Sequence, residues 1–214
     1  IVGTAGGTTT TLGRIGTGFI YADWNGQIAY TTPNMNGLSL TLGLMQPWNS
    51  TTSTVGNTTL GAAVSGASAG STDQFGFQGQ GSYSWTGDFA GKVWAGFFSQ
   101  EVTAIPDGGT GSDERATAFE LGVSATVANI NLVAYGYSGE GVGTTALLRD
   151  GFDATGKMRD SDGGYVQATY VIPTGTKLGV SYGISKLDDN AADAGAGLVE
   201  ENTMLTVGAY HPLT

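Results

Sequence analysis

The chain has 214 residues, a net charge of −10 at neutral pH and no cysteine. The acidic balance excludes a nucleic-acid-binding surface, because no basic stripe is present to neutralise phosphates, and the lack of cysteine excludes disulfides, zinc–thiolate sites and thiol catalysis. Charged residues make up only 12% of the chain and hydrophobic residues 40%. Since soluble domains carry about 25% charged residues, this composition favours a surface that faces lipid.

Nine segments alternate apolar and polar side chains, which is the pattern of a strand with one apolar and one polar face. No segment approaches the roughly 20 apolar residues of a membrane-spanning helix. In chain order the predicted strands are 19–31, 37–47, 73–85, 89–102, 116–127, 130–138, 164–172, 176–187 and 201–211.

The connections between these strands are alternately short and long. The short ones are 33–36, 86–88, 128–129 and 173–175, and the long, Gly/Ser/Thr/Asp-rich ones are 49–72, 103–115, 139–163 and 188–200. Consecutive connections of an up-and-down barrel lie on opposite rims, and outer-membrane barrels combine short turns on one rim with long loops on the other. The sequence therefore predicts an all-β, antiparallel up-and-down transmembrane β-barrel that occupies residues 1–214 as a single domain.

In such a barrel the apolar face points outward to lipid and the polar face lines a water-filled interior. The segment 130–138 is ambiguous, because Tyr135 and Tyr137 compete with Leu132 and Ala134 for the apolar side. On the polar faces, the predicted pore-lining residues are Asp23, Gln78, Gln80, Lys92, Glu120, Gln167 and Lys177.

Aromatic residues gather toward the strand ends, as in the girdles that membrane barrels place at the two interfaces. The predicted girdle residues are Trp24, Tyr30, Trp48, Tyr83, Trp85, Phe89, Tyr170 and Tyr210.

Several phrases of the chain resemble Gram-negative general porins. These are GRIGTGFIYADW (13–24) with QIAYTTP (27–33), GLSLTLGLMQP (37–47), TKLGVSYGIS (176–185) and LTVGAYHPL (205–213). The resemblance implies a 16-stranded, homotrimeric barrel of the bacterial outer membrane, in contact with lipopolysaccharide, with a constriction loop folded into its lumen.

The sequence departs from that family pattern in three ways. Nine strands are too few, no acidic constriction-loop motif is recognisable, and the chain ends at Thr214 without closing strands or a terminal aromatic residue. We therefore expect an internal fragment of a longer porin, incomplete at both ends. Residues 1–18 do not resemble a signal peptide, so an export leader is expected to have been removed or to lie outside this sequence.

No catalytic or cofactor site is predicted. Gly66–Gly70 matches the G-x-S-x-G elbow, but that elbow needs a strand-to-helix turn and a partner histidine, whereas this match lies in a small-residue loop and His211 is the only histidine. A lone histidine does not make a metal site. Adventitious Ca²⁺ at the neighbouring carboxylates of Asp160 and Asp162 is the one ion site that the sequence suggests.

The acidic residues of the long connections predict a vestibule that concentrates cations, with Arg14, Arg149, Lys157 and Arg159 as basic residues that can face them. The predicted function is passive diffusion of small hydrophilic solutes and ions, with a mild cation preference. Two alternatives stay open at this point: a non-conducting structural or adhesive outer-membrane barrel, and a soluble β-sandwich binding protein.

Overall fold

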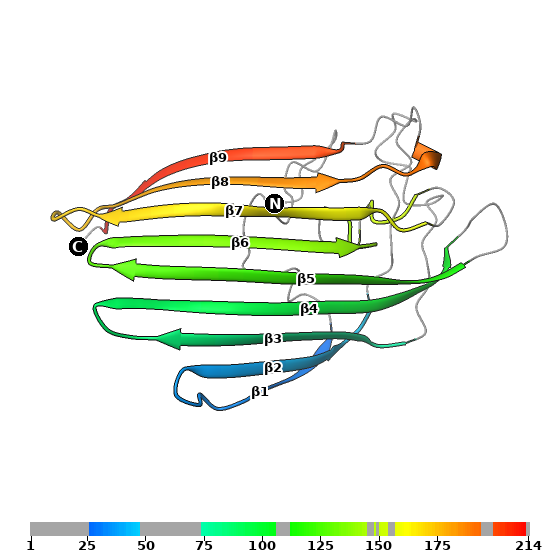
Figure 1. Cartoon of the computed structure of the whole chain (residues 1–214), viewed down its shortest axis with the longest axis horizontal. Coiled ribbons are helices and arrows are strands. Elements are labelled where there is room, and N and C mark those ends of the chain that lie inside the picture. Colours follow the sequence, from blue (N-terminus) through cyan, green and yellow to red (C-terminus); the bar gives the residue numbers. More distant parts are fainter. Residues whose placement is uncertain are drawn as a thin grey trace.

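The computed structural model describes residues 26–47, 74–105, 112–144, 148, 150–153, 157–193 and 199–212. Apart from one 3-10 turn, η1 (Ala191–Asp193), the regular structure in these ranges is β (Figure 1). No helix in the described ranges is long and apolar enough to cross a membrane. The strands are β1 (Gln27–Thr31), β2 (Leu38–Met45), β3 (Gly76–Trp85), β4 (Phe89–Ile105), β5 (Ser112–Val127), β6 (Ile130–Glu140), β7 (Asp160–Val171), β8 (Lys177–Leu187) and β9 (Glu201–Tyr210).

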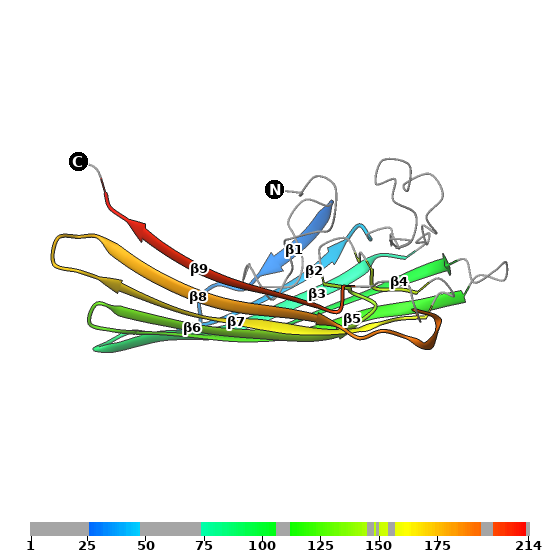
Figure 2. The same ribbon diagram turned by 90° about the horizontal axis from the view of Figure 1, so that it is seen from above.

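The strands form one sheet in the order in which they follow each other in the chain, and every neighbouring pair is antiparallel. This up-and-down arrangement confirms the predicted fold class. The sheet is open and strongly curved, and the two edge strands β1 and β9 rise on the same side of it (Figure 2). The described strands therefore make a single curved wall, and not the two packed sheets of a sandwich.

Two strands are longer than the sequence pattern predicts. β4 continues to Ile105 and β5 begins at Ser112, so the connection predicted at 103–115 narrows to residues 106–111. The register of this pair shifts between Val102 and Ile105. A β-bulge of this kind inserts an extra residue and breaks the two-residue period, which is why the alternation is lost before the strand ends.

The strand β7 also begins earlier than predicted, at Asp160 instead of Gly164. Asp160 pairs with Glu140, and Asp162 pairs with Ser138 and Lys186. Acidic residues next to Gly163 and Gly164 are typical of a loop. In the structure, however, they extend the strand pairing beyond the apolar part of the sheet.

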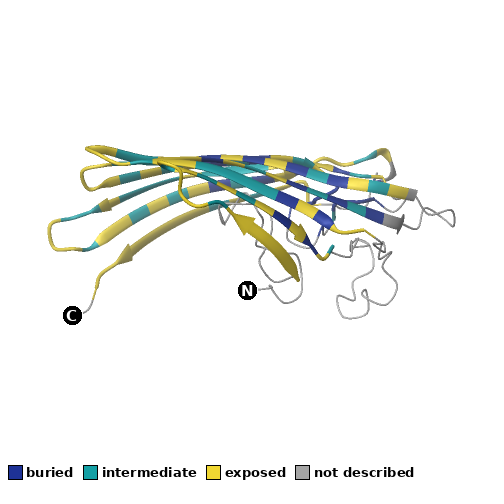
Figure 3. Cartoon of the chain, turned by 90° about the horizontal axis from the view of Figure 1, so that it is seen from below, coloured by how far each residue is buried: buried dark blue, intermediate teal, exposed yellow. Residues whose placement is uncertain are grey.

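One face of the sheet, here called the outer face, is apolar over most of its length. Large hydrophobic side chains remain exposed on it from every strand. Exposure alternates along much of the central strands, whereas the edge strand β1 is exposed throughout and β9 over most of its length (Figure 3). On β5 the apolar stretch runs from Phe119 to Val127, about 27 Å at ~3.4 Å per residue, close to the ~25 Å apolar band of membrane barrels. Charged residues then take over the same face at the long-connection ends: Glu101, Arg115, Glu140, Asp160, Asp162, Lys186 and Glu201.

The opposite, inner face is the concave one. Part of it lies under residues 141–159, here called the covering segment, whose described parts are 141–144, 148, 150–153 and 157–159. This segment lies on the concave side of the sheet (Figure 2). Its side chains Val142, Leu148 and Phe152 are buried in one apolar cluster with inner-face residues that include Phe98 and Ala116.

Candidate functional site: the inner face

The strand register decides which predicted residues share the inner face. One row across the sheet runs Gln80, Gly96, Glu120, Tyr137, Gly163 and Ser185. A second row runs Ser84, Lys92, Ser124, Val133, Gln167 and Ser181. Of the predicted pore-lining residues, Gln78, Gln80, Lys92, Glu120, Gln167 and Lys177 therefore lie on this face, and Asp23 lies outside the described residues.

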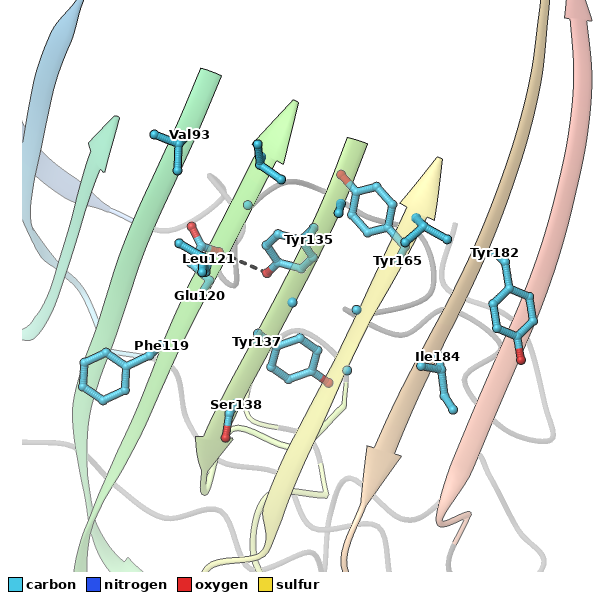
Figure 4. Close-up of a pocket in the computed structure, with 17 residues that line it drawn as sticks. Val93, Phe119, Glu120, Leu121, Tyr135, Tyr137, Ser138, Tyr165, Tyr182 and Ile184 are labelled. Carbon is cyan, nitrogen blue, oxygen red and sulfur yellow. Dashed lines mark hydrogen bonds between the residues drawn. The ribbon is translucent and has the colours of Figure 1, made fainter. Parts of the chain in front are cut away.

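Glu120 carries a carboxylate in the middle of this wall. Its Oε2 accepts a hydrogen bond from the Tyr135 hydroxyl at 3.0 Å, and its Oε1 accepts one from Gln80 Nε2 at 3.1 Å (Figure 4). The residue is 6% exposed. Hydrogen bonds to a charged acceptor are the stronger kind, so donors from β3 and β6 hold this β5 carboxylate in a defined place.

The tyrosines that the sequence left ambiguous belong to the inner face. Tyr135 pairs with Gly122 and Tyr165, and its ring lies 5.4 Å from that of Tyr165 between centroids. Leu132 and Ala134 take the outer face instead. Hydropathy does not decide such a case, because a tyrosine has an apolar ring and a polar hydroxyl. The sequence signal that could have placed Tyr135 is its spacing of two and four residues from Val133 and Asn131, which puts all three on the same face.

The charges of the inner face are sorted along the strands. Glu114 lies toward the long connections, because it pairs with Val102 near the end of β4, and Glu120 lies midway along β5. Lys92 and Lys177 lie toward the short turns. The ammonium of Lys92 is 5.7 Å from the centroid of the Trp94 ring, a cation–π distance. The inner face therefore carries acidic side chains from its middle toward one end and basic side chains near the other.

Arg159 and Asp193 join the covering segment to the connection between β8 and β9. Nε of Arg159 donates to Asp193 Oδ2 at 2.8 Å and Nη2 donates to Oδ1 at 2.5 Å, a bidentate pair. Nη1 donates to the carbonyl oxygens of Asp150 and Phe152. Both charged residues are buried, so the guanidinium fastens the covering segment from several directions.

Asn190 and Asp153 complete this loop junction, defined here as Arg159, Asp193, Asn190 and Asp153. The backbone N–H of Asn190 donates to Asp193, and its side-chain amide donates to Asp153 Oδ2 and to the Met158 carbonyl. The hydrogen bonds from Arg159 hold the pKa of Asp193 below its usual range, helped by the Asn190 N–H and the positive charge, while burial acts in the opposite direction. The expectation that Arg159 faces the acidic connections agrees with this contact.

The predicted aromatic girdle is placed on the outer face for most of its described members. Tyr83, Trp85 and Phe89 form a row at a short turn, with ring centroids 6.2 and 6.0 Å apart. Tyr30 and Tyr170 lie on the same face near their own short turns. That these rings sit at a membrane interface stays a prediction.

Tyr210 departs from this group. It pairs with Lys177, whereas Leu205, Val207 and Ala209 hold the outer face of β9. Successive side chains alternate between faces, so the register gives Tyr210 the inner face, unlike the other described members, and its place in a girdle stays a prediction. A position at a strand end does not by itself tell which face of the sheet a side chain lies on; the alternation along the strand is needed as well. Trp24 and Trp48 lie outside the described residues.

The outer face has a shallow apolar groove where its residues are small. Ala134, Gly136 and Gly164 line it, together with larger side chains that include Leu121 and Tyr182, both labelled in Figure 4. The surface that lines the groove is mostly apolar.

The residues suggested for Ca²⁺, Asp160 and Asp162, are on one face of β7. In the described ranges, no three or more His, Asp or Glu residues are grouped closely enough to hold a metal ion. Calcium binding here stays a prediction.

Comparison with known proteins adds one finding. A family model described as Gram-negative porin matches the chain over residues 1–214. No curated protein sequence matches it.

Proposed function

The chain belongs to the Gram-negative porin family, and on that premise we propose that its inner face lines the diffusion channel and gives it a mild preference for cations. Membership makes the protein an outer-membrane porin channel that passes small solutes, which is a channel family and not a family of enzymes. What the proposal adds is the identity of the channel wall and the sign of its selectivity.

The division between the two faces supports this choice of wall. The outer face is apolar and exposed between the short turns and the charged strand ends, which suits lipid. The inner face instead carries Gln80, Glu120, Gln167 and the lysines at positions 92 and 177. A polar concave wall behind an apolar convex one is the arrangement that a water-filled channel requires.

The single observation that carries the cation preference is the Glu120 carboxylate held by Tyr135 and Gln80. A fixed negative charge in a narrow, low-dielectric passage attracts cations and repels anions. The net charge of −10 acts in the same direction. Lys92 and Lys177 oppose it near the short turns, which makes the expected preference mild.

Reversal potentials in planar bilayers under a salt gradient test this proposal. The protein should conduct in discrete steps and favour cations, and Glu120→Gln should reduce that preference because it removes the wall charge and keeps the side-chain shape. Glu140→Gln is the matched control, since Glu140 is exposed on the outer face, and it should change the selectivity less than Glu120→Gln does. A wild-type protein that inserts without conducting would favour a structural or adhesive barrel instead.

Homotrimer formation and contact with lipopolysaccharide are parts of the same proposal, and they rest on the resemblance to general porins. Cross-linking in native membranes, read on denaturing gels, measures the assembly: a trimer band supports it, and a monomer alone contradicts it.

The proposed transport needs no cofactor, because diffusion through a polar channel involves no chemical step; adventitious Ca²⁺ at Asp160 and Asp162 would not change this.

A further inference from the structure

Large side chains of the inner face lie opposite glycines. Gln78 pairs with Gly43, Trp94 with Gly122, Glu120 with Gly96, and Tyr137 with Gly163. Directly opposed residues of an antiparallel pair have Cβ atoms only ~5 Å apart, so a glycine at one position leaves the space that its side chain would have used.

The large side chains occupy that space. A Cβ added at Gly122 would overlap the Cζ2 and Cε2 atoms of the Trp94 ring, so the indole lies directly over this glycine. A Cβ added at Gly96 would lie 2.7 Å from Glu120 Oε1, and one at Gly43 would lie 3.0 Å from Gln78 Nε2. Each side chain therefore folds sideways over the glycine of the neighbouring strand, and each is buried there. Trp94 also belongs to the apolar cluster that includes Val142 and Phe152.

We propose that these cross-strand glycines set the free width of the channel, by letting Trp94, Glu120 and Gln78 lie along the wall instead of projecting into the lumen. The inference rests on the proposed function, because it takes the inner face to be the channel wall. It goes further by assigning pore width to residues that have no side chain, and it predicts that the smallest possible addition to the wall narrows the channel.

The outer face offers the contrast that separates pore width from stability. The ring of Phe97 covers Gly79 there, at 2.5 Å from the Cβ that an alanine would add. Covering a glycine with an aromatic ring is a known way to stabilise a sheet, and on the outer face it has no lumen to affect. Gly79→Ala thus displaces the aromatic ring of Phe97, as Gly122→Ala displaces that of Trp94, but it does not narrow the channel.

A second contrast is Gly208 on β9. It pairs with Gly179 on the inner face, and a Cβ added there meets no atom within 4 Å. Gly208→Ala adds the same methyl group to the wall as Gly122→Ala, but it pushes no large side chain away from it.

Single-channel conductance of the purified protein in planar bilayers tests the proposal. Gly122→Ala should lose conductance relative to wild type, while Gly79→Ala and Gly208→Ala should keep the wild-type value. Adding Trp94→Ala to Gly122→Ala should restore the conductance, because the displaced indole is then gone.

Equal conductance of Gly122→Ala and Gly79→Ala would overturn the proposal, as would a failure of Trp94→Ala to restore the loss. If Gly122→Ala does not assemble, Gly96→Ala takes its place, because its added methyl group meets the Glu120 side chain and not an aromatic ring. Conductance equal to wild type would then contradict the proposal. The wild-type protein separates the two levels of inference: absence of any conductance defeats the proposed function, whereas conducting variants without the predicted differences defeat only the role of the glycines.

Discussion

Toward the long connections, the inner face is packed like the interior of a soluble protein, with Phe98, Val102 and Ala116 buried under Val142 and Phe152 of the covering segment. Toward the short turns, the same face presents Lys92 and Lys177 as exposed side chains, with Ser124 and Gln167 half-buried between them. The two halves share the strands β4 and β5, and they differ both in the character of their side chains and in what lies over them. A period-two pattern assigns a residue to a face; whether that face is dry or wet depends on a connection elsewhere in the chain.

The largest expected effect comes from breaking the attachment of the covered half. Arg159→Ala leaves the Asp193 carboxylate buried without its cation, and such a loss costs about 3 to 5 kcal/mol. The covering segment should then be released from the inner face. Cleavage after Lys157 by a lysine-specific protease, followed by mass spectrometry of the folded protein, measures this release. Unchanged protection of Lys157 would show that the apolar cluster holds the segment without the ion pair.

A smaller effect is expected from acid, which protonates Asp193 and so weakens the same ion pair with Arg159. The pKa of Asp193 lies below its ordinary value of 3.8, so the stability from its charge is fully present above that value and is lost only as the pH falls through the lower, folded pKa. Protection of the covering segment should thus persist at about pH 4 to 5, which lies above the ordinary pKa of an aspartate. It should fail only in stronger acid. Hydrogen exchange across a pH series measures it, with Asp193→Asn as the variant that is released at every pH. Release near neutral pH would contradict the assignment to Asp193.

The smallest effect is expected at the open strand end, where a second ion pair is joined by a single hydrogen bond. Arg115 Nη2 lies 2.7 Å from Glu101 Oε2, but the Arg115 side chain is 43% exposed. Exposed pairs contribute about 0 to 1 kcal/mol, so Arg115→Ala should change unfolding in urea by no more than that. A loss as large as that of Arg159→Ala would mean that burial does not distinguish the two pairs.

The sequence was sufficient for the parts of the fold that lipid imposes. Between the short turns and residues such as Phe119, one face must be apolar and the other polar, so alternation reveals the strands. Beyond that band both faces meet water, and the signal disappears: the strand from Asp160 to Gly163 looks like a loop, and the bulge near Val102 hides the end of β4.

The candidate site was predictable only residue by residue. The assignment of Gln80, Glu120 and Gln167 to the inner face follows from the alternation of side chains along each strand alone. The pairing of Arg159 with Asp193 joins positions 34 residues apart, and no local pattern specifies which of several acidic residues the guanidinium selects. The cover over Phe98 and Ala116 is equally non-local, because it depends on where Val142 and Phe152 pack.

Because each described strand pairs only with its sequence neighbours, no contact between strands waits for a distant part of the chain. Such a sheet can grow one hairpin at a time, each new strand docking on the edge left by the previous one, and local contacts of this kind favour fast folding. The growing edge, however, exposes unpaired backbone groups, which the hydrocarbon core does not tolerate. Assembly and insertion of the wall are therefore expected to proceed together, strand by strand, from whichever hairpin forms first.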